Sequence, residues 1–468
     1  MRAARLAAAS RAFTAAAAAA PSSVGILAAE LYVPSRFVAQ SALETADGVS
    51  AGKYTVGLGQ TSMAFVDDRE DINSIALTAL ARLLKTYGVD PRRVGRLEVG
   101  TESLVDKSKS TKTTLMSLLA ASGNRDVEGA TTLNACYGGT AALFNSAAWA
   151  ASPEARGRLA VYVAADIAVY EAGPARPTGG AGAVAVLVGA GAPLALVPGV
   201  RTTHAVDAYD FYKPALGSEY PAVDGKLSQS CYLEAVDACY NGTMARLGAA
   251  RLADAFDFMA FHSPYNKLVA QSFRRCLFND ARRAAAAGAP LPAALAALEP
   301  FARLPAAATL ANRDLDKALA ALGAAEYAAA VGPTEALSKA IGNSYAAALH
   351  ANLLCLAAGK GEALAGKTVG AFSYGSGAIA TMFALRGVAA APGAEFTLDR
   401  IARAVDVPAR LATRAEASPA DFVAALKMRE ASYGRAGFVP AGDVKHVAPG
   451  AFYLKEVKAG GQRVYEQN

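Results

Sequence analysis

Cys136 is the side chain in this sequence whose surroundings most favour covalent chemistry. It lies in the run NACYGG, where small and polar residues lead into the helix-forming segment TAALFNSAAWAA. A thiolate near a helix N-terminus is stabilised by backbone amides and the helix dipole, so we expect a lowered pKa for Cys136. The two glycines leave space for a substrate. An inert buried cysteine is the alternative, and it is the commoner fate of a lone cysteine.

A carboxylate and an imidazole are the candidate partners of this thiol. Glu102 follows the short strand predicted at 95–101, and His262 ends the apolar strand predicted at 256–262. Side chains at the carboxyl ends of strands gather where α/β active sites form, and both groups can move protons. From the local sequence alone, a surface carboxylate and a core histidine remain the alternatives.

Glycine-rich and basic segments add candidate ligand contacts. The run SYGSG (373–377) can present backbone amides to an oxyanion, although ordinary tight turns have the same composition. Lys53, Lys213 and Lys267 each lie beside an aromatic or glycine-rich motif, which makes them candidate partners for phosphate groups. Solvated surface lysines are the alternative.

The elements that must position these residues alternate in type along the chain. Helical spacing covers 71–87 and 115–122, whereas 158–165 and 179–189 have the continuous apolar character of buried strands. This alternation predicts an α/β fold with a parallel or mixed sheet covered on both faces. The segment 370–385 resembles 179–189, with small residues followed by an apolar strand. That similarity suggests two related α/β halves.

Composition limits the class of protein. The chain has 468 residues, of which 53% are hydrophobic and 18% charged, typical of two or three well-buried globular units. The net charge of +6 is spread along the chain, which argues against nucleic-acid binding, and no apolar stretch of about 20 residues predicts a membrane span. The five cysteines are widely spaced without a CxxC motif. We therefore expect no disulfide framework, no metal site and a reducing compartment.

Two alanine-rich segments differ from the rest. Residues 1–21 contain three arginines and no acid, which is typical of an organelle transit peptide, although a disordered tail is an equal alternative. Residues 277–330 combine alanine with four prolines and predict peripheral helices joined by loops.

A series of motifs indicates a family. The segments GKYTVGLGQ, DREDINS, GRLEVGTES, DKSKSTKT, NACYGGTAA, DIAVY, ARPTGGAGAVA, YDFYKP, SEYPAVDGKLS, FHSPYNKLV and FSYGSG occur in this order. From about Val24 to the C-terminus the chain resembles the 3-hydroxy-3-methylglutaryl-CoA synthases of eukaryotic type. The resemblance implies a thiolase-like layered αβαβα fold, usually homodimeric. Its two pseudo-duplicated halves would be 22–196, with the nucleophile, and 197–468, with His262 and the SYGSG turn.

The resemblance also implies a reaction. Family members join acetyl-CoA to acetoacetyl-CoA and water, and release 3-hydroxy-3-methylglutaryl-CoA and CoA. By resemblance, Cys136 carries the acetyl group, Glu102 removes a proton from it, and His262 acts at the acceptor oxygen. No metal or redox cofactor is implied. The reaction serves mevalonate, isoprenoid and sterol synthesis or ketogenesis, in the cytoplasm or in mitochondria.

Further positions match ligand contacts of the family. The substrate- or CoA-binding positions are Ala51, Lys53, Thr178, Ser228, Lys267, Asn343 and Ser376. Polar residues near the family's site correspond to Asp166, His204, Asp210 and Tyr374. The chain departs from the family at Ser50, Leu133, Pro174 and Gln271, where aspartate, threonine, asparagine and lysine are usual. These departures concern CoA affinity more than the reaction.

Two other functions remain open from the sequence. A β-branching synthase would perform the same chemistry on β-ketoacyl groups bound to an acyl carrier protein. A catalytically weak relative would serve as a structural or binding protein. The lysines available for CoA favour the first function, and the joint presence of Glu102, Cys136 and His262 argues against an inactive relative.

Overall fold

A mixed ten-stranded sheet forms the centre of the computed structural model, which describes residues 23–310 and 312–468. The expected transit peptide at 1–21 lies outside the described residues. In sheet order the strands are β12 (Phe258–Phe261), β13 (Thr368–Gly375), β14 (Ile379–Gly387), β8 (Leu194–Leu196), β1 (Val24–Tyr32), β7 (Gly180–Ala190), β6 (Leu159–Ala168), β4 (Val94–Gly100) and β5 (Thr131–Thr132). The tenth strand, β9 (Thr202–Ala205), pairs with β14.

The sheet consists of two five-stranded halves. Strands β1, β4, β5, β6 and β7 precede residue 191, and β8, β9, β12, β13 and β14 follow it. Short β8 joins the halves because it pairs with both β1 and β14. Each half combines parallel pairs, such as β4–β6 and β12–β13, with antiparallel ones, such as β6–β7 and β13–β14. This repeated composition agrees with the duplication inferred from the sequence.

One predicted strand is in fact a hairpin. The segment 370–385 was expected to be a small-residue stretch followed by one strand, but it forms most of β13 and β14, which pair as far as Gly375 and Ile379. Gly377 in the connecting turn has a φ of 116°, which glycine adopts without steric cost. Small and apolar residues continue through the turn, so hydropathy alone did not reveal the reversal.

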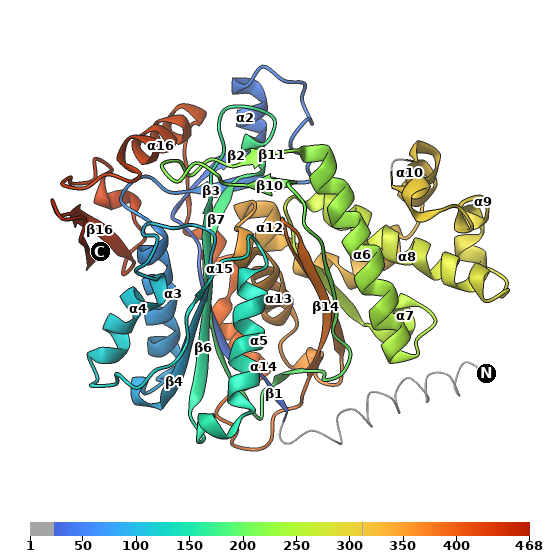
Figure 1. Cartoon of the computed structure of the whole chain (residues 1–468), viewed down its shortest axis with the longest axis horizontal. Coiled ribbons are helices and arrows are strands. Elements are labelled where there is room, and N and C mark those ends of the chain that lie inside the picture. Colours follow the sequence, from blue (N-terminus) through green and yellow to red (C-terminus); the bar gives the residue numbers. More distant parts are fainter. Residues whose placement is uncertain (1–22, 311) are drawn as a thin grey trace.

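Helices form three layers around the two half-sheets (Figure 1). Helices α5 (Gly138–Ala150) and α13 (Ala348–Lys360) lie between the halves, where Leu143 and Leu353 share a core with Tyr162 and Phe383. Alternate residues of the strands face outward, as expected for extended chains. They pack against α3 (Ile72–Tyr87) and α4 (Thr111–Ala120) on one side, and against α6 (Gly225–Leu247) and α8 (Asn266–Ala286) on the other. The order is the expected αβαβα.

Capping side chains explain where the outer helices begin. Asp71 accepts a hydrogen bond from the Ser74 amide in a capping box, and Gly88 closes α3 with a φ of 61°, which confirms the predicted helix at 71–87. Helix α4 begins at Thr111, earlier than the predicted residue 115, because the Ser110 hydroxyl caps it.

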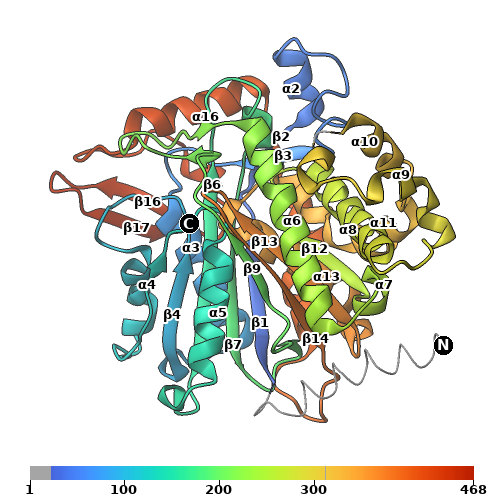
Figure 2. The same cartoon turned by 45° about the vertical axis from the view of Figure 1, so that its right-hand side comes forward.

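The remaining elements surround this body. The alanine-rich region forms peripheral helices with a small core of their own around Phe278, Leu298 and Leu315, at the right of Figure 2, as predicted. The other helices and strands are α2 (Gln40–Ala46), α7 (Leu252–Ala255), α9 (Glu299–Ala302), α10 (Arg313–Ala320), α11 (Ala324–Ala330), α12 (Ala336–Ile341), α14 (Leu398–Val405), α15 (Val407–Ala412), α16 (Pro419–Ser432), β2 (Arg36–Ala39), β3 (Ser62–Phe65), β10 (Phe211–Tyr212), β11 (Ala222–Val223), β15 (Ala415–Glu416), β16 (Phe452–Val457) and β17 (Arg463–Gln467). Among the described residues, we find no helix with the length and apolar character of a membrane span.

Candidate active site

Cys136 lies in a tight turn at the start of the inner helix α5. Ala135 has a φ of 44°, an uncommon value outside glycine, and the helix begins at Gly138. The end of β13 packs directly on this turn, since a Cβ on Gly375 would lie 2.6 Å from the Tyr137 nitrogen. The two halves therefore meet at the thiol, which is partly accessible.

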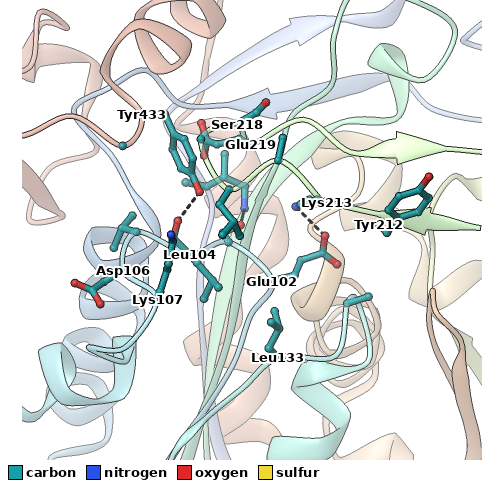
Figure 3. A pocket seen from close by; sticks show the side chains of 18 of the residues that line it. Glu102, Leu104, Asp106, Lys107, Leu133, Tyr212, Lys213, Ser218, Glu219 and Tyr433 are labelled. Carbon is teal, nitrogen blue, oxygen red and sulfur yellow. Dashed lines mark hydrogen bonds and ion pairs between the residues drawn. The ribbon is translucent and has the colours of Figure 1, made fainter. Parts of the chain in front are cut away.

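Glu102 contacts this thiol. It follows the end of β4, and its Oε2 accepts a hydrogen bond from the Cys136 sulfur at 3.6 Å. Its other oxygen, Oε1, forms an ion pair with the Lys213 ammonium at 2.9 Å (Figure 3). The carboxylate thus lies between a nucleophile and a cation.

Asp166 organises the backbone around Glu102. Its Oδ1 accepts hydrogen bonds from the amides of Glu102 and Ser103 and from two hydroxyls, and its Oδ2 accepts the Ala346 amide at 2.9 Å. Burial and the charge of Glu102 raise the pKa of Asp166 to about 7, although Lys213 and these hydrogen bonds oppose the rise. Asp166 therefore lies beside Glu102 and holds the backbone of residues 102–103 in place.

The resting thiol differs from our expectation. Burial, followed by the nearby charges of Glu102 and Asp166, raises the pKa of Cys136 well above its ordinary value. The prediction of a lowered pKa is wrong because it considered the helix N-terminus and not the burial of the thiol, nor the carboxylates that the fold brings to it. A proton acceptor must accompany this thiol, and Glu102 is in contact with it.

Lys213 also differs from expectation. It was a candidate phosphate partner, but its ammonium faces Glu102 and lies 4.7 Å from the ring centre of Tyr345 and 5.8 Å from that of Phe211. Burial disfavours its charge, but the charge and hydrogen bond of Glu102 outweigh this and raise the pKa of Lys213 to about 12. Lys213 is therefore a charged part of the site.

His262 lies in the other half, at the end of β12 next to β13. It follows β12, and its amide donates to the Phe372 carbonyl of β13 at 2.7 Å, while its own carbonyl accepts from the Tyr232 hydroxyl. Burial, with a smaller effect of His350, lowers the pKa of His262 to about 3. The imidazole is therefore neutral at physiological pH.

The turn after β13 is held by another predicted polar residue. Asp210 accepts hydrogen bonds from the Tyr374 hydroxyl at 2.9 Å and from the Gly377 amide at 2.8 Å. Ser376 lies in this turn, as expected. His204 lies apart on the edge strand β9, opposite Ala380.

One cavity adjoins Glu102 and Lys213, and a second lies at the segment that contains Lys53. The larger, of about 800 Å³, is lined by Glu102, Lys213, Leu133 and an apolar wall that includes Leu216 (Figure 3). The second, of about 420 Å³, is lined by residues that include Lys53, Pro174 and Arg176.

The expected ligand-binding residues come from several loops. Ala51 and Lys53 lie in the turn 51–58, and the Leu58 carbonyl accepts the Lys267 amide at 2.9 Å, so the two lysine segments adjoin. The Asn343 amide donates to the Gly179 carbonyl, next to Thr178. Ser228 lies in the first turn of α6.

Comparison with known proteins identifies the family. Residues 20–193 match the hydroxymethylglutaryl-coenzyme A synthase N-terminal family, and residues 194–468 match its C-terminal counterpart. The chain belongs to the hydroxymethylglutaryl-CoA synthase family. Hydroxymethylglutaryl-CoA synthase A of Dictyostelium discoideum is 46% identical over 96% of this chain and 91% of its own length. The mitochondrial enzyme of Homo sapiens is 46% identical over 95% and 89%.

A solved structure agrees with this family membership. MvaS in complex with 3-hydroxy-3-methylglutaryl coenzyme A has a TM-score of 0.81 and 34% identity, and the match covers 96% of this chain and all of that one. The thiolase-like layered fold of the hydroxymethylglutaryl-CoA synthases is therefore that of this chain. Like other family members, the chain is an acyl-transferring condensing enzyme.

An aromatic cluster that the sequence does not predict lies beside Cys136 in this hydroxymethylglutaryl-CoA synthase fold. Tyr170, Phe211 and Tyr345 pack edge to face, with centroids 5.7 to 6.4 Å apart, and Cys136 packs against them. Tyr345 has a φ of 42°, a conformation that tyrosine rarely adopts. Aromatic residues in DIAVY, YDFYKP and GNSY were visible in the sequence, but nothing local showed that they meet.

Proposed function

We propose that the chain condenses acetyl-CoA with acetoacetyl-CoA and water, giving 3-hydroxy-3-methylglutaryl-CoA and free CoA. Membership of the family supports this activity. The observation that carries the mechanism is the contact between the Cys136 sulfur and Glu102 Oε2 at 3.6 Å. It joins a nucleophile and a base in the arrangement that a covalent condensation requires.

The first step is transfer of the acetyl group. The Cys136 thiol gives its proton to Glu102 Oε2, the thiolate attacks the acetyl-CoA carbonyl, and CoA leaves and takes up the proton. One thioester is exchanged for another, so the free energy changes little. Because the thiol has a raised pKa, contact with a proton acceptor favours this step.

The second step forms the carbon–carbon bond. Glu102 removes a proton from the acetyl methyl group, and the enolate attacks the ketone carbon of acetoacetyl-CoA. The ketone oxygen becomes an alkoxide, which the neutral His262 stabilises by donating an N–H hydrogen bond until the alkoxide takes up the proton that Glu102 removed. Water then hydrolyses the thioester and restores Cys136.

We propose ligand roles that follow the family pattern. Lys53 and Lys267 contact CoA phosphates, and their adjoining backbone segments support this role. Ala51, Thr178, Ser228, Asn343 and Ser376 complete the CoA and substrate contacts. Every step moves protons and acyl groups without a net change of oxidation state, so CoA thioesters suffice without a resident cofactor.

The chain also suggests how the protein assembles. Strand β5 is at the edge of the large sheet, and next to it Leu133 is 58% exposed. A sheet edge beside exposed apolar surface favours association, and we propose that the protein is a homodimer. Within each chain we propose two halves, 22–196 and 197–468. Light scattering of the purified protein measures its oligomeric state, and a monomer at assay concentration would contradict the proposed homodimer.

We propose an organelle-targeting role for residues 1–21. Their arginines and lack of acids support it. Curated relatives include both mitochondrial and cytoplasmic forms. Fusion of residues 1–30 to a fluorescent protein tests the compartment, and diffuse cytoplasmic fluorescence argues against targeting.

One assay tests the proposed reaction. Purified protein is mixed with acetyl-CoA and acetoacetyl-CoA, and loss of the acetoacetyl enolate absorbance is followed. Turnover with free acetoacetyl-CoA supports the proposal, and no turnover contradicts it. Turnover with a carrier-bound acceptor alone would instead identify a β-branching synthase acting in polyketide assembly.

A further inference from the structure

The two oxygens of the Glu102 carboxylate have different neighbours. Oε2 accepts the hydrogen bond of the Cys136 thiol at 3.6 Å, whereas Oε1 lies 2.9 Å from the ammonium of Lys213. A carboxylate whose two oxygens are bound on opposite sides is restrained in its terminal rotation. Lys213 therefore orients the oxygen that faces the sulfur, where the acetyl group would be attached.

The position of Lys213 is itself well defined. It directly follows the short strand β10, and its side chain is 20% exposed. The ammonium lies over the ring of Tyr345 at 4.7 Å and near that of Phe211 at 5.8 Å, and cation–π attraction stabilises a desolvated cation in such a site. The lysine is thus held in place by contacts independent of Glu102.

We propose that Lys213 is a positioning residue for the reaction: it holds the Glu102 carboxylate with Oε2 directed at the acetyl group on Cys136. This inference rests on the proposed function and adds a residue to it. Lys213 acts through Glu102 and need not touch the substrate.

The electrostatics of the cluster support this role. The groups that face Glu102 and Lys213 are Cys136 at the start of α5, Asp166 on β6, and the hydroxyls of Tyr170 and Tyr345. The negative charge of Asp166 repels the Glu102 carboxylate, whereas the Lys213 ammonium attracts it. The ammonium therefore helps to hold the carboxylate beside the thiol.

Replacement by methionine tests the proposal. Lys213→Met keeps most of the side-chain volume and removes the charge. We expect kcat for condensation to fall about 100-fold, while KM for acetyl-CoA changes little. Single-turnover labelling by acetyl-CoA at pH 8 should fall much less. Lys213→Arg should recover much of the rate, because it restores a cation beside Oε1.

A double variant distinguishes positioning from a separate effect. If Lys213 acts through Glu102, Glu102→Gln and Glu102→Gln/Lys213→Met should condense equally slowly. Additive losses would overturn the proposal, as would a Lys213→Met enzyme that condenses within threefold of the wild-type rate. If the methionine variant fails to fold, Lys213→Arg still decides: a folded arginine variant without activity contradicts the proposal.

A matched control removes a lysine from an ion pair outside the site. Lys367 pairs with Asp257 at 3.1 Å, so Lys367→Met should leave both steps unchanged. Wild-type turnover is measured in the same assay. Its absence would refute the proposed function, whereas wild-type turnover combined with an unaffected Lys213→Met enzyme would refute this inference alone.

Discussion

Glu102 and His262 follow two strands that occupy comparable places in the two half-sheets, β4 and β12, yet their surroundings differ. Glu102 lies among ionisable groups: it contacts the Cys136 thiol and the Lys213 ammonium, and its amide donates to Asp166. His262 is buried beside aromatic rings such as that of Tyr232. Beside Glu102, the pKa of Asp166 is raised to about 7, whereas the pKa of His262 is lowered to about 3. Burial is the main cause of both shifts.

This difference matches the two tasks of the proposed reaction. Proton removal requires a carboxylate that stays charged in a buried place, which a nearby cation favours. Stabilisation of an alkoxide requires a hydrogen-bond donor, and burial provides it as a neutral imidazole. Changes on the Glu102 side should therefore separate the reaction steps, whereas changes on the His262 side should affect the acceptor.

The largest effect is expected for the nucleophile. Cys136→Ser should abolish labelling of the protein by radioactive acetyl-CoA and reduce turnover about 10⁴-fold or more, because a hydroxyl does not replace the thiol in thioester exchange. Autoradiography after denaturation measures the label. Persistent labelling would place the nucleophile on another residue.

Glu102→Gln should separate the two steps. We expect condensation to fall about 10³-fold, since the amide cannot remove the methyl proton. Labelling by acetyl-CoA should fall much less, because removal of the Glu102 charge lowers the pKa of the Cys136 thiol, and this offsets the loss of the proton acceptor. Single-turnover labelling and steady-state assays provide the comparison. Equal loss of both steps would contradict this division of labour.

His262→Ala should be milder. Loss of one donor to the developing alkoxide is expected to reduce condensation about 10²-fold and to leave acetyl-enzyme formation near the wild-type rate. The same two assays apply. Loss of acetylation in a folded variant would mean that His262 acts on the thiol as well.

The smallest effect concerns stability. Burial also lowers the pKa of His350 to about 3, and its ring nitrogen contacts the Tyr162 hydroxyl. Between pH 6.5 and 3 the unfolded chain binds the proton and the folded protein does not, so stability falls as the pH falls, by about 1.4 kcal/mol per pH unit for each such histidine.

Replacement of His350 should reduce this slope. His350→Gln keeps a hydrogen-bonding side chain but does not titrate. When urea unfolding is measured at several pH values, the free energy of unfolding of this variant should therefore depend less on pH, by the contribution of one histidine. Asp166 has the opposite sign, because its raised pKa reduces stability as the pH rises from about 4 to about 7. An unchanged slope in His350→Gln would show that this histidine is protonated in the folded protein.

Much of the fold was predictable because its signals are local. Asp71 and Gly88 delimit α3 through capping and a left-handed residue, and the apolar runs of β6 and β7 identify buried strands. The hairpin of β13 and β14 was missed, since glycine and alanine occur in the turn as well as in the strands. A reversal hidden in one uniform composition leaves no change of hydropathy to detect.

The candidate site could also be predicted only in part. Cys136, Glu102 and His262 could be selected from the sequence because each lies in a motif that resembles the family, whereas the local elements alone left alternatives open. The protonation states of the site residues could not be predicted, since a pKa depends on burial and on every charge within a few ångströms. Glu102 contacts a thiol that lies 34 positions further along the chain and contributes to its raised pKa. It also pairs with the ammonium of Lys213, 111 positions away.

The sequence by itself determined which chemical groups this protein carries and the family to which it belongs, because these are properties of residue order. Only the tertiary structure decided how the groups act on one another. Folding brings β4, β6 and β10 together, so that a thiol, two carboxylates and one ammonium share a partly desolvated volume. In such a volume charges interact strongly, and that interaction gives the same residue types their different roles.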